Sequence, residues 1–248
     1  MLLRISSVIL LAAIWEAAGR GEWVDPRFLS YPSAILVAGV DLMSSGELWP
    51  HALTSLQELL FGFLAALVVG ILLGILMGWS KVINELFDPV LTSLYCLPRT
   101  SLMPLIVIWL GVGLSSKAAI VFLGAIFPIL VNTIAGIRSA DPIWVRAAVV
   151  FGARQWEIFH KILLPSSLPY IMAGVRLGLG RAILGVIVGE MYVATRGIGH
   201  QIMLYQVGLN VDYLFFLVLL TAFTGVLLVN AARRLEARLG RWQEESRS

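Results

Sequence analysis

The charged side chains that lie within otherwise apolar runs are the residues of this sequence best placed to act on a solute. Arg99 lies between two prolines in the run 89–112, and Arg181 and Glu190 lie in the run 171–193. A charge inside a membrane span is costly and commonly marks a substrate or ion pathway. We therefore predict Arg99, Arg181 and Glu190 as substrate-pathway residues, with the arginines able to bind a small anion.

Each of these residues also has a structural interpretation. Arg99 is close enough to the cytoplasmic end of its run for the side chain to reach water. Arg181 and Glu190 could instead take part in an ion pair across a subunit interface. The sequence leaves these alternatives open.

No motif for bond-breaking chemistry accompanies these charges. There is no G-x4-G-K-[ST] phosphate loop, since every lysine follows a residue other than glycine. The histidines are scattered without a second ligand at metal-binding spacing, and neither G-x-S-x-G nor H-E-x-x-H occurs. We expect no catalytic residue, no metal site, no cofactor and no ATP site in this chain.

The composition indicates an all-α membrane protein. Hydrophobic residues make up 59% of the 248 residues, charged residues make up 13%, and the mean hydropathy is +0.89. Soluble domains carry roughly 25% charged residues, and a spanning helix needs about 20 mostly apolar residues. We predict a single transmembrane domain, 1–248, with six spans at about 5–19, 59–79, 89–112, 118–137, 171–193 and 213–232.

The first of these runs resembles a signal sequence, because it is short and follows Arg4. Trp15 and Glu16 stand where a cleavage site needs small neutral residues. We therefore expect an uncleaved first span.

The basic residues predict the orientation in the membrane. With the N-terminus inside, most Lys and Arg residues outside the spans fall on the cytoplasmic side. The outer side receives Arg20, Arg27, Lys117 and Arg196. Since cytoplasmic segments are enriched in positive residues, we predict cytoplasmic termini and a cytoplasmic polar segment at 141–165.

The second span carries a small residue at every fourth position: Gly62, Ala66, Gly70, Gly74 and Gly78. This spacing places them on one helical face. It predicts that a neighbouring helix packs closely against that face.

The polar segment 141–165 begins with the signals of a short helix. Asp141 can cap a helix, because its carboxylate can accept from free backbone N–H groups, and Pro142 suits the first helical position. A helical run over 143–151 is followed by Gly152, where a left-handed C-cap favours glycine.

A second amphipathic run, 155–164, is predicted to stop at Pro165, because proline breaks a helix interior. The segment is therefore predicted to form two short helices joined at a glycine. An ordinary amphipathic loop is the alternative.

Six residues of this segment fall at the spacing A-A-x3-G-x9-I-x-L-P. The pattern resembles the EAA loop of permease subunits in binding-protein-dependent ABC importers, with Arg146 in place of the family's leading glutamate. The resemblance implies that the first short helix is a coupling helix, which docks in a groove of a separate ATPase subunit. The coupling residues implied in this way are Asp141, Arg146, Ala147, Ala148, Gly152, Ile162, Leu164 and Pro165.

The resemblance covers about 28–230. The stretches YCLPRTSLMPLIVIWLGVG, LFDPVL, SKAAIVFLGAIFPILVNT and GEMYVATRGIGHQI resemble the nitrate, sulfonate, taurine and bicarbonate branch of these permeases. The resemblance implies that the chain is a type I ABC importer permease in a bacterial inner membrane. Its implied partners are cytoplasmic ATPase subunits, an extracytoplasmic substrate-binding protein and a second permease copy, with a homodimer the simpler case, and no nucleic acid.

The predicted function is therefore that of a permease subunit importing a small anion or organic solute of the nitrate, sulfonate or taurine class, while a partner hydrolyses ATP. One alternative is the same mechanism for a thiamine-precursor-like or other neutral molecule. A membrane-embedded enzyme and an ATP-independent carrier are remote alternatives.

The segment 20–58 is expected to form short helices on the outer face, either as a lid or as part of the surface that receives the binding protein.

Overall fold

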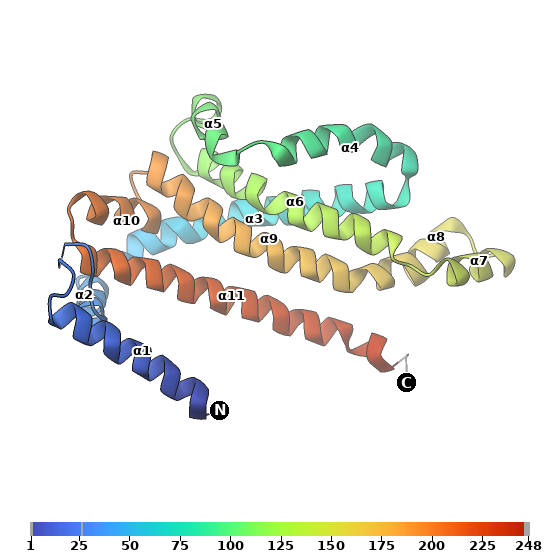
Figure 1. Ribbon diagram of the computed structural model, residues 1–248. Coiled ribbons are helices and arrows are strands. Elements are labelled where there is room, and N and C mark those ends of the chain that lie inside the picture. Colours follow the sequence, from blue (N-terminus) through green and yellow to red (C-terminus); the bar gives the residue numbers. More distant parts are fainter. Residues whose placement is uncertain (1, 26, 246–248) are drawn as a thin grey trace. The chain divides into compact units, whose positions relative to one another are not determined.

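The computed structural model describes residues 2–25 and 27–245, and the regular structure of these residues is entirely helical (Figure 1). This confirms the all-α prediction. The elements are α1 (Leu2–Arg20), α2 (Pro32–Ser44), α3 (Leu48–Trp79), α4 (Lys81–Cys96), the 3-10 turn η1 (Arg99–Leu102), α5 (Met103–Leu110), α6 (Leu114–Arg138), α7 (Pro142–Val150), α8 (Gln155–Ile158), the π turn η2 (Phe159–Leu163), α9 (Leu164–Val193), α10 (Ile198–Val207) and α11 (Val211–Glu245).

Four helical runs in the described chain are long and apolar enough to cross a membrane. They are α3, α6, the run Gln155–Val193 and the part Val211–Ala237 of α11. These runs contain the spans expected at 59–79, 118–137, 171–193 and 213–232. Residues 5–19 are helical as part of α1, and their role as a span stays a prediction.

The expected third span, 89–112, in which Pro98 and Pro104 are predicted to break the helix, is not one helix. α4 ends at Cys96, and η1 and α5 follow as separate short elements. Leu97 is extended, with ψ at 133°, because the following Pro98 disfavours a helical conformation at that residue. Pro104 does not break α5, since it lies in the first turn, where a missing N–H is tolerated.

Pro165 does not end the helical run that begins at Gln155, which corrects a prediction. α8, η2 and α9 form one helical run from Gln155 to Val193. In the π turn the Leu164 N–H donates to the Phe159 carbonyl, so the hydrogen-bond ladder shifts by one residue immediately before the proline. Pro165 then falls in the first turn of α9, where proline is accommodated.

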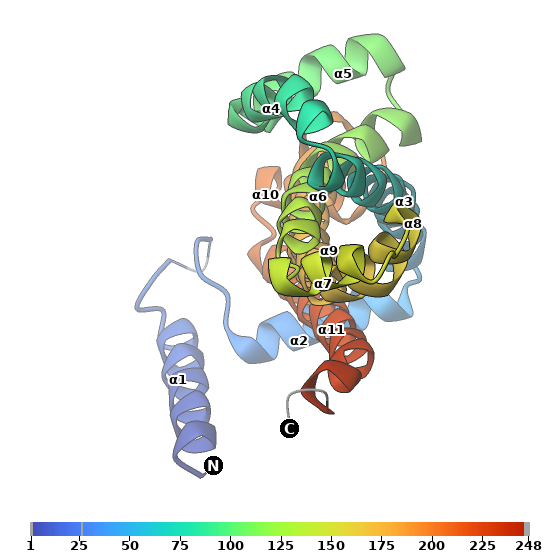
Figure 2. The same cartoon turned by 90° about the vertical axis from the view of Figure 1, so that its right-hand side faces the viewer.

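The described chain divides into two compact units. Unit 1 comprises Met1–Gln57 and Ile187–Thr224, and unit 2 comprises Glu58–Val186 and Gly225–Ser248. Within unit 2, α6 lies between α9 on one side and α4 with α5 on the other, as both views show (Figures 1 and 2). α6 is therefore the central helix of this unit.

Small residues allow α6 to pack closely against its neighbours in unit 2. A β-carbon at Gly62 would lie 2.5 Å from the Val121 β-carbon, and one at Gly74 would lie 2.5 Å from the Thr133 β-carbon. Gly174 lets α9 approach the backbone of α6 in the same way. The close packing predicted from the small residues of α3 is confirmed, and its partner is α6.

Unit 1 has its own apolar core. Leu42, Leu48, Ile202 and Leu217 pack together from α2, α3, α10 and α11. The segment expected to hold only short helices contains α2 and also the first turns of α3, which begins at Leu48 and not at 59. Its position on the outer face stays a prediction.

Candidate functional site

The N-terminus of α7 has the predicted cap. Asp141 is extended, and its Oδ1 accepts a hydrogen bond of 2.8 Å from the Ile143 N–H. Pro142 occupies the first helical position. The helix is therefore started by local residues alone.

The C-terminus of α7 also ends in a local cap. Gly152 has φ of +81°, and the Gly152 N–H donates to the Val149 carbonyl at 3.0 Å. The next amide, of Ala153, donates to the Ala148 carbonyl at 2.9 Å. These two bonds form a Schellman motif, which requires a left-handed residue at the position of Gly152.

α7 and its C-cap residue Phe151 carry apolar side chains that the described chain leaves largely exposed. Phe151 is 90% exposed and Val150 is 83% exposed, and Ile143, Trp144 and Val149 are also exposed. Several exposed apolar side chains close together in a segment outside the expected membrane spans are typical of a protein interaction site. We call these five residues the α7 patch.

The coupling residues predicted from the sequence fall into two groups around this patch. Asp141, Arg146 and Gly152 are exposed, whereas Ala147, Ala148, Ile162, Leu164 and Pro165 are half-buried. The second helix of the segment is anchored in unit 2, because the Phe159 ring stacks on Trp79 with centroids 4.9 Å apart. The half-buried group thus supports the segment, and the exposed group borders the patch.

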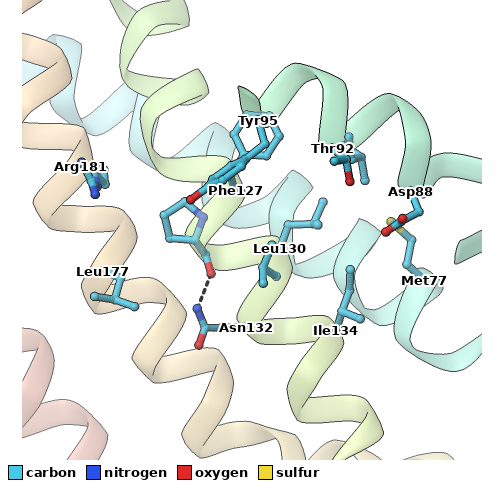
Figure 3. A pocket seen from close by; sticks show the side chains of 13 residues that line it. Met77, Asp88, Thr92, Tyr95, Phe127, Leu130, Asn132, Ile134, Leu177 and Arg181 are labelled. Atoms are coloured by element: carbon cyan, nitrogen blue, oxygen red, sulfur yellow. Dashed lines mark hydrogen bonds between the residues drawn. The ribbon is translucent and has the colours of Figure 1, made fainter. Parts of the chain in front are cut away.

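Unit 2 also holds a cavity of about 710 Å³ among α3, α4, α6 and α9 (Figure 3). Its polar lining residues are Asp88, Thr92, Tyr95, Asn132 and Arg181. Figure 3 shows Arg181 on one side of the cavity and Asp88 on the other, with the Tyr95 and Phe127 rings between them. Those rings pack edge to face, with centroids 5.6 Å apart. One arginine and one carboxylate thus line the same cavity.

The predicted pathway residues differ in their surroundings. Arg181 lines the cavity, and Glu190 is fully buried in unit 1, where it binds protein donors. Arg99 lies in η1, and its side chain falls outside the described residues. Sequence reasoning did not select the other polar lining residues, because Thr92, Tyr95 and Asn132 carry no charge and Asp88 lies just before the expected third span.

Lys117, which is expected on the outer side of the membrane, takes part in a buried ion pair within unit 2. Lys117 belongs to α6, and its Nζ lies 2.6 Å from Glu58 Oε1 of α3. The two side chains are 7% and 1% exposed. A charge can be buried in this way because it has an opposite charge at hydrogen-bond distance.

Among the described residues, no group of three His, Cys, Asp or Glu side chains is placed to hold a metal ion. The residues with site-like geometry are therefore the α7 patch, which could bind a protein, and the cavity beside Arg181, which could bind a solute.

Comparison with known proteins gives a family match and several similar proteins. Residues 66–241 match the family described as binding-protein-dependent transport system inner membrane component. The chain is 30% identical to the taurine transport system permease protein TauC of Escherichia coli over 248 residues, which cover 98% of this chain and 90% of that protein. It is 35% identical over 244 residues to SsuC of the same organism, which is named as an aliphatic sulfonates transport permease, with coverage of 97% and 93%. It is 29% identical to the formylaminopyrimidine transport permease protein ThiX of Halalkalibacterium halodurans, with coverage of 96% and 94%.

Proposed function

Because this chain belongs to the family of inner membrane components of binding-protein-dependent transport systems, we propose that α7 is the helix through which partner ATPase subunits act on it. The chain is the permease subunit of an ABC importer, and in this family the ATPase activity resides in partner subunits. The single observation that carries the proposal is the α7 patch, which is apolar, exposed and held between two local caps.

The predicted coupling residues have distinct roles in this proposal. Asp141 and Gly152 fix the two ends of α7, and Arg146 places a positive charge on its exposed surface. A cation there would favour an acidic residue in the ATPase groove. The half-buried residues Ala147, Ala148, Ile162, Leu164 and Pro165 support the segment from behind.

Co-purification with the ATPase encoded beside the permease gene tests this role. Val150→Asp and Phe151→Asp place a charge in the proposed interface, so we expect each to abolish recovery of the ATPase with the permease. Val207→Asp is the matched control, because Val207 is 76% exposed on α10, outside the patch. Equal recovery with all three variants, or solute uptake by the purified permease without an ATPase, would contradict the proposal.

We further propose a small anion of the sulfonate class as the solute. Arg181 supplies a cation to the cavity, and two relatives are named for taurine and aliphatic sulfonates. Arg99 remains a second candidate for the pathway. A neutral pyrimidine-like solute is the alternative, because the relative ThiX is named for formylaminopyrimidine.

Uptake kinetics separate these two solute classes. Arg181→Gln should raise the KM for a sulfonate about tenfold or more, since a hydrogen bond to a charged group contributes roughly 1.5–3 kcal/mol. Arg233→Gln, at an exposed arginine of α11, is the control and should leave the KM unchanged. Uptake of a pyrimidine but no sulfonate, unaffected by Arg181→Gln, would favour the alternative.

We propose that a second copy of this chain completes the permease, and that an extracytoplasmic binding protein delivers the solute. The distribution of basic residues supports cytoplasmic termini in a bacterial inner membrane. Pairing with a paralogous permease is the alternative arrangement, and the mass of the purified complex distinguishes the two.

A further inference from the structure

The N-terminus of α10 is capped by side chains that come from other helices. The first amides of a helix have no partner within it, and here the preceding residue, Gly197, has no side chain to offer. The Gly197 N–H donates to His51 Nδ1 at 3.0 Å, the Ile198 N–H to Ser55 Oγ at 2.9 Å, and the Gly199 N–H to Glu190 Oε2 at 2.8 Å. Three successive amides are thus held by α3 and α9.

The three capping side chains form one connected cluster within unit 1. Ser55 Oγ donates to Glu190 Oε1 at 2.6 Å. His51 and Ser55 are four residues apart on α3, so they lie on the same face of that helix. The side-chain amide of Gln201, one turn into α10, lies 2.7 Å from His51 Nε2. We call His51, Ser55 and Glu190 the α10 clamp.

The backbone around the clamp leaves no room for larger residues. A β-carbon at Gly197 would overlap the Glu190 carboxyl group, and one at Gly199 would overlap the Ile187 carbonyl oxygen. Gly197 also has φ of +125°. The glycines therefore let a buried carboxylate reach the positive end of a helix, where an anion is stabilised.

Glu190 has the geometry of a positioning residue and not of a cargo contact. It is 0% exposed, and each of its carboxylate oxygens accepts a hydrogen bond from the protein. Its helix, α9, is continuous with α8 and therefore reaches the segment that carries α7. The cap on Gly199 therefore attaches α10 to one end of a helical run whose other end follows α7 in the sequence.

We propose that the α10 clamp, with Glu190 at its centre, fixes α10 to α3 and α9, so that docking of the binding protein on the permease is transmitted along α9 to the ATPases. This inference rests on the proposed function, since it assigns Glu190 a role in coupling. It replaces the prediction that Glu190 lines the substrate pathway.

Amide hydrogen exchange and ATPase stimulation, measured on the reconstituted complex, test the clamp. Glu190→Ala should speed exchange of the amides of residues 197–199 about tenfold or more, because a buried charge-assisted hydrogen bond is lost. It should also reduce the stimulation of ATPase activity by loaded binding protein. Ser55→Ala should produce the same two changes to a smaller extent, and it serves as the milder variant if Glu190→Ala fails to assemble.

Glu190→Gln separates positioning from a requirement for charge at a cargo site. The glutamine oxygen can still accept from the Gly199 N–H, and its amide can donate to Ser55 Oγ, so we expect most of the stimulation to be retained. Glu85→Ala, at an exposed carboxylate of α4, is the matched control and should change neither measurement.

Two results would contradict the role proposed for the α10 clamp. One is unchanged exchange at residues 197–199 in both Glu190→Ala and Ser55→Ala. The other is a Glu190→Gln variant that fails as fully as Glu190→Ala and shows an altered KM for the solute. If wild-type permease recruits no ATPase, the proposed function fails, and the exchange data on the permease alone still decide whether the clamp exists.

Discussion

The two short helices α7 and α10 are similar in length but are held in place by opposite means. α7 is capped by its own neighbours in the chain, Asp141 and Gly152, and its apolar face is exposed. α10 receives its N-terminal caps from α3 and α9, and Ile202 packs in the core of unit 1. A locally capped helix can keep its shape while it changes partners, whereas a remotely capped helix must move with the helices that hold it.

This difference suits the two positions proposed for these helices in the transport cycle. α7 would bind and follow a separate subunit, and such a helix needs a shape of its own and a hinge. α10 would pass the effect of binding-protein docking on to α9, and such a helix needs rigid attachment to its neighbours. Substitutions at Gly197, Gly152 and Asp141 test this difference between the two helices.

Gly197→Ala should have the largest effect, because it combines overlap with Glu190 and strain at a φ of +125°. We expect it to lower the free energy of unfolding by about 3 kcal/mol or more. Thermal unfolding of the purified permease measures this loss. Gly180→Ala is the control, since a β-carbon there meets nothing within 4 Å. Equal stability of the two variants would show that α10 is not held by the clamp.

Gly152→Val should have a smaller effect, because the site is strained in φ but has empty space around it. The expected cost is about 1–2 kcal/mol, from the left-handed conformation alone. Gly152→Asn should retain most of the stability, because asparagine tolerates this conformation. If valine and asparagine are equally tolerated in thermal unfolding, the local C-cap of α7 is not what sets its end.

Asp141→Ala should have the smallest effect of the three. Loss of an N-cap costs about 1 kcal/mol, and the loss should be confined to α7. Amide exchange over residues 143–147 measures it as faster local opening, while residues 197–199 should be unaffected. Asp141→Ser keeps a capping oxygen and should behave as wild type. Faster exchange in α10 would contradict the separation of the two helices.

The contrast between local and remote contacts also explains how much the sequence alone could predict. The ends of α7 follow from Asp141, Pro142 and Gly152, whose preferences act within a few residues, and the close packing of α3 follows from a regular spacing of small residues. Four of the expected spans follow from length and composition.

The features that the sequence did not predict depend on partners far away in the chain. The burial of Lys117 depends on Glu58, and the clamp on α10 joins residues separated by 9 to 146 positions. At Pro165, a shift of the helical ladder over the preceding π turn overrides the usual breaking effect of proline. Pro98, in contrast, has no such turn before it and divides the third expected span, as the sequence predicts for a proline at this position.

Amide hydrogen exchange of the permease with and without its ATPase is the most direct test of the central claim. Binding should protect the amides of residues 143–152, because the α7 patch would be buried, and should leave exchange at residues 197–199 unchanged. Protection confined to α7 would establish it as the ATPase-docking helix. An ATPase that binds without protecting α7 would contradict that assignment.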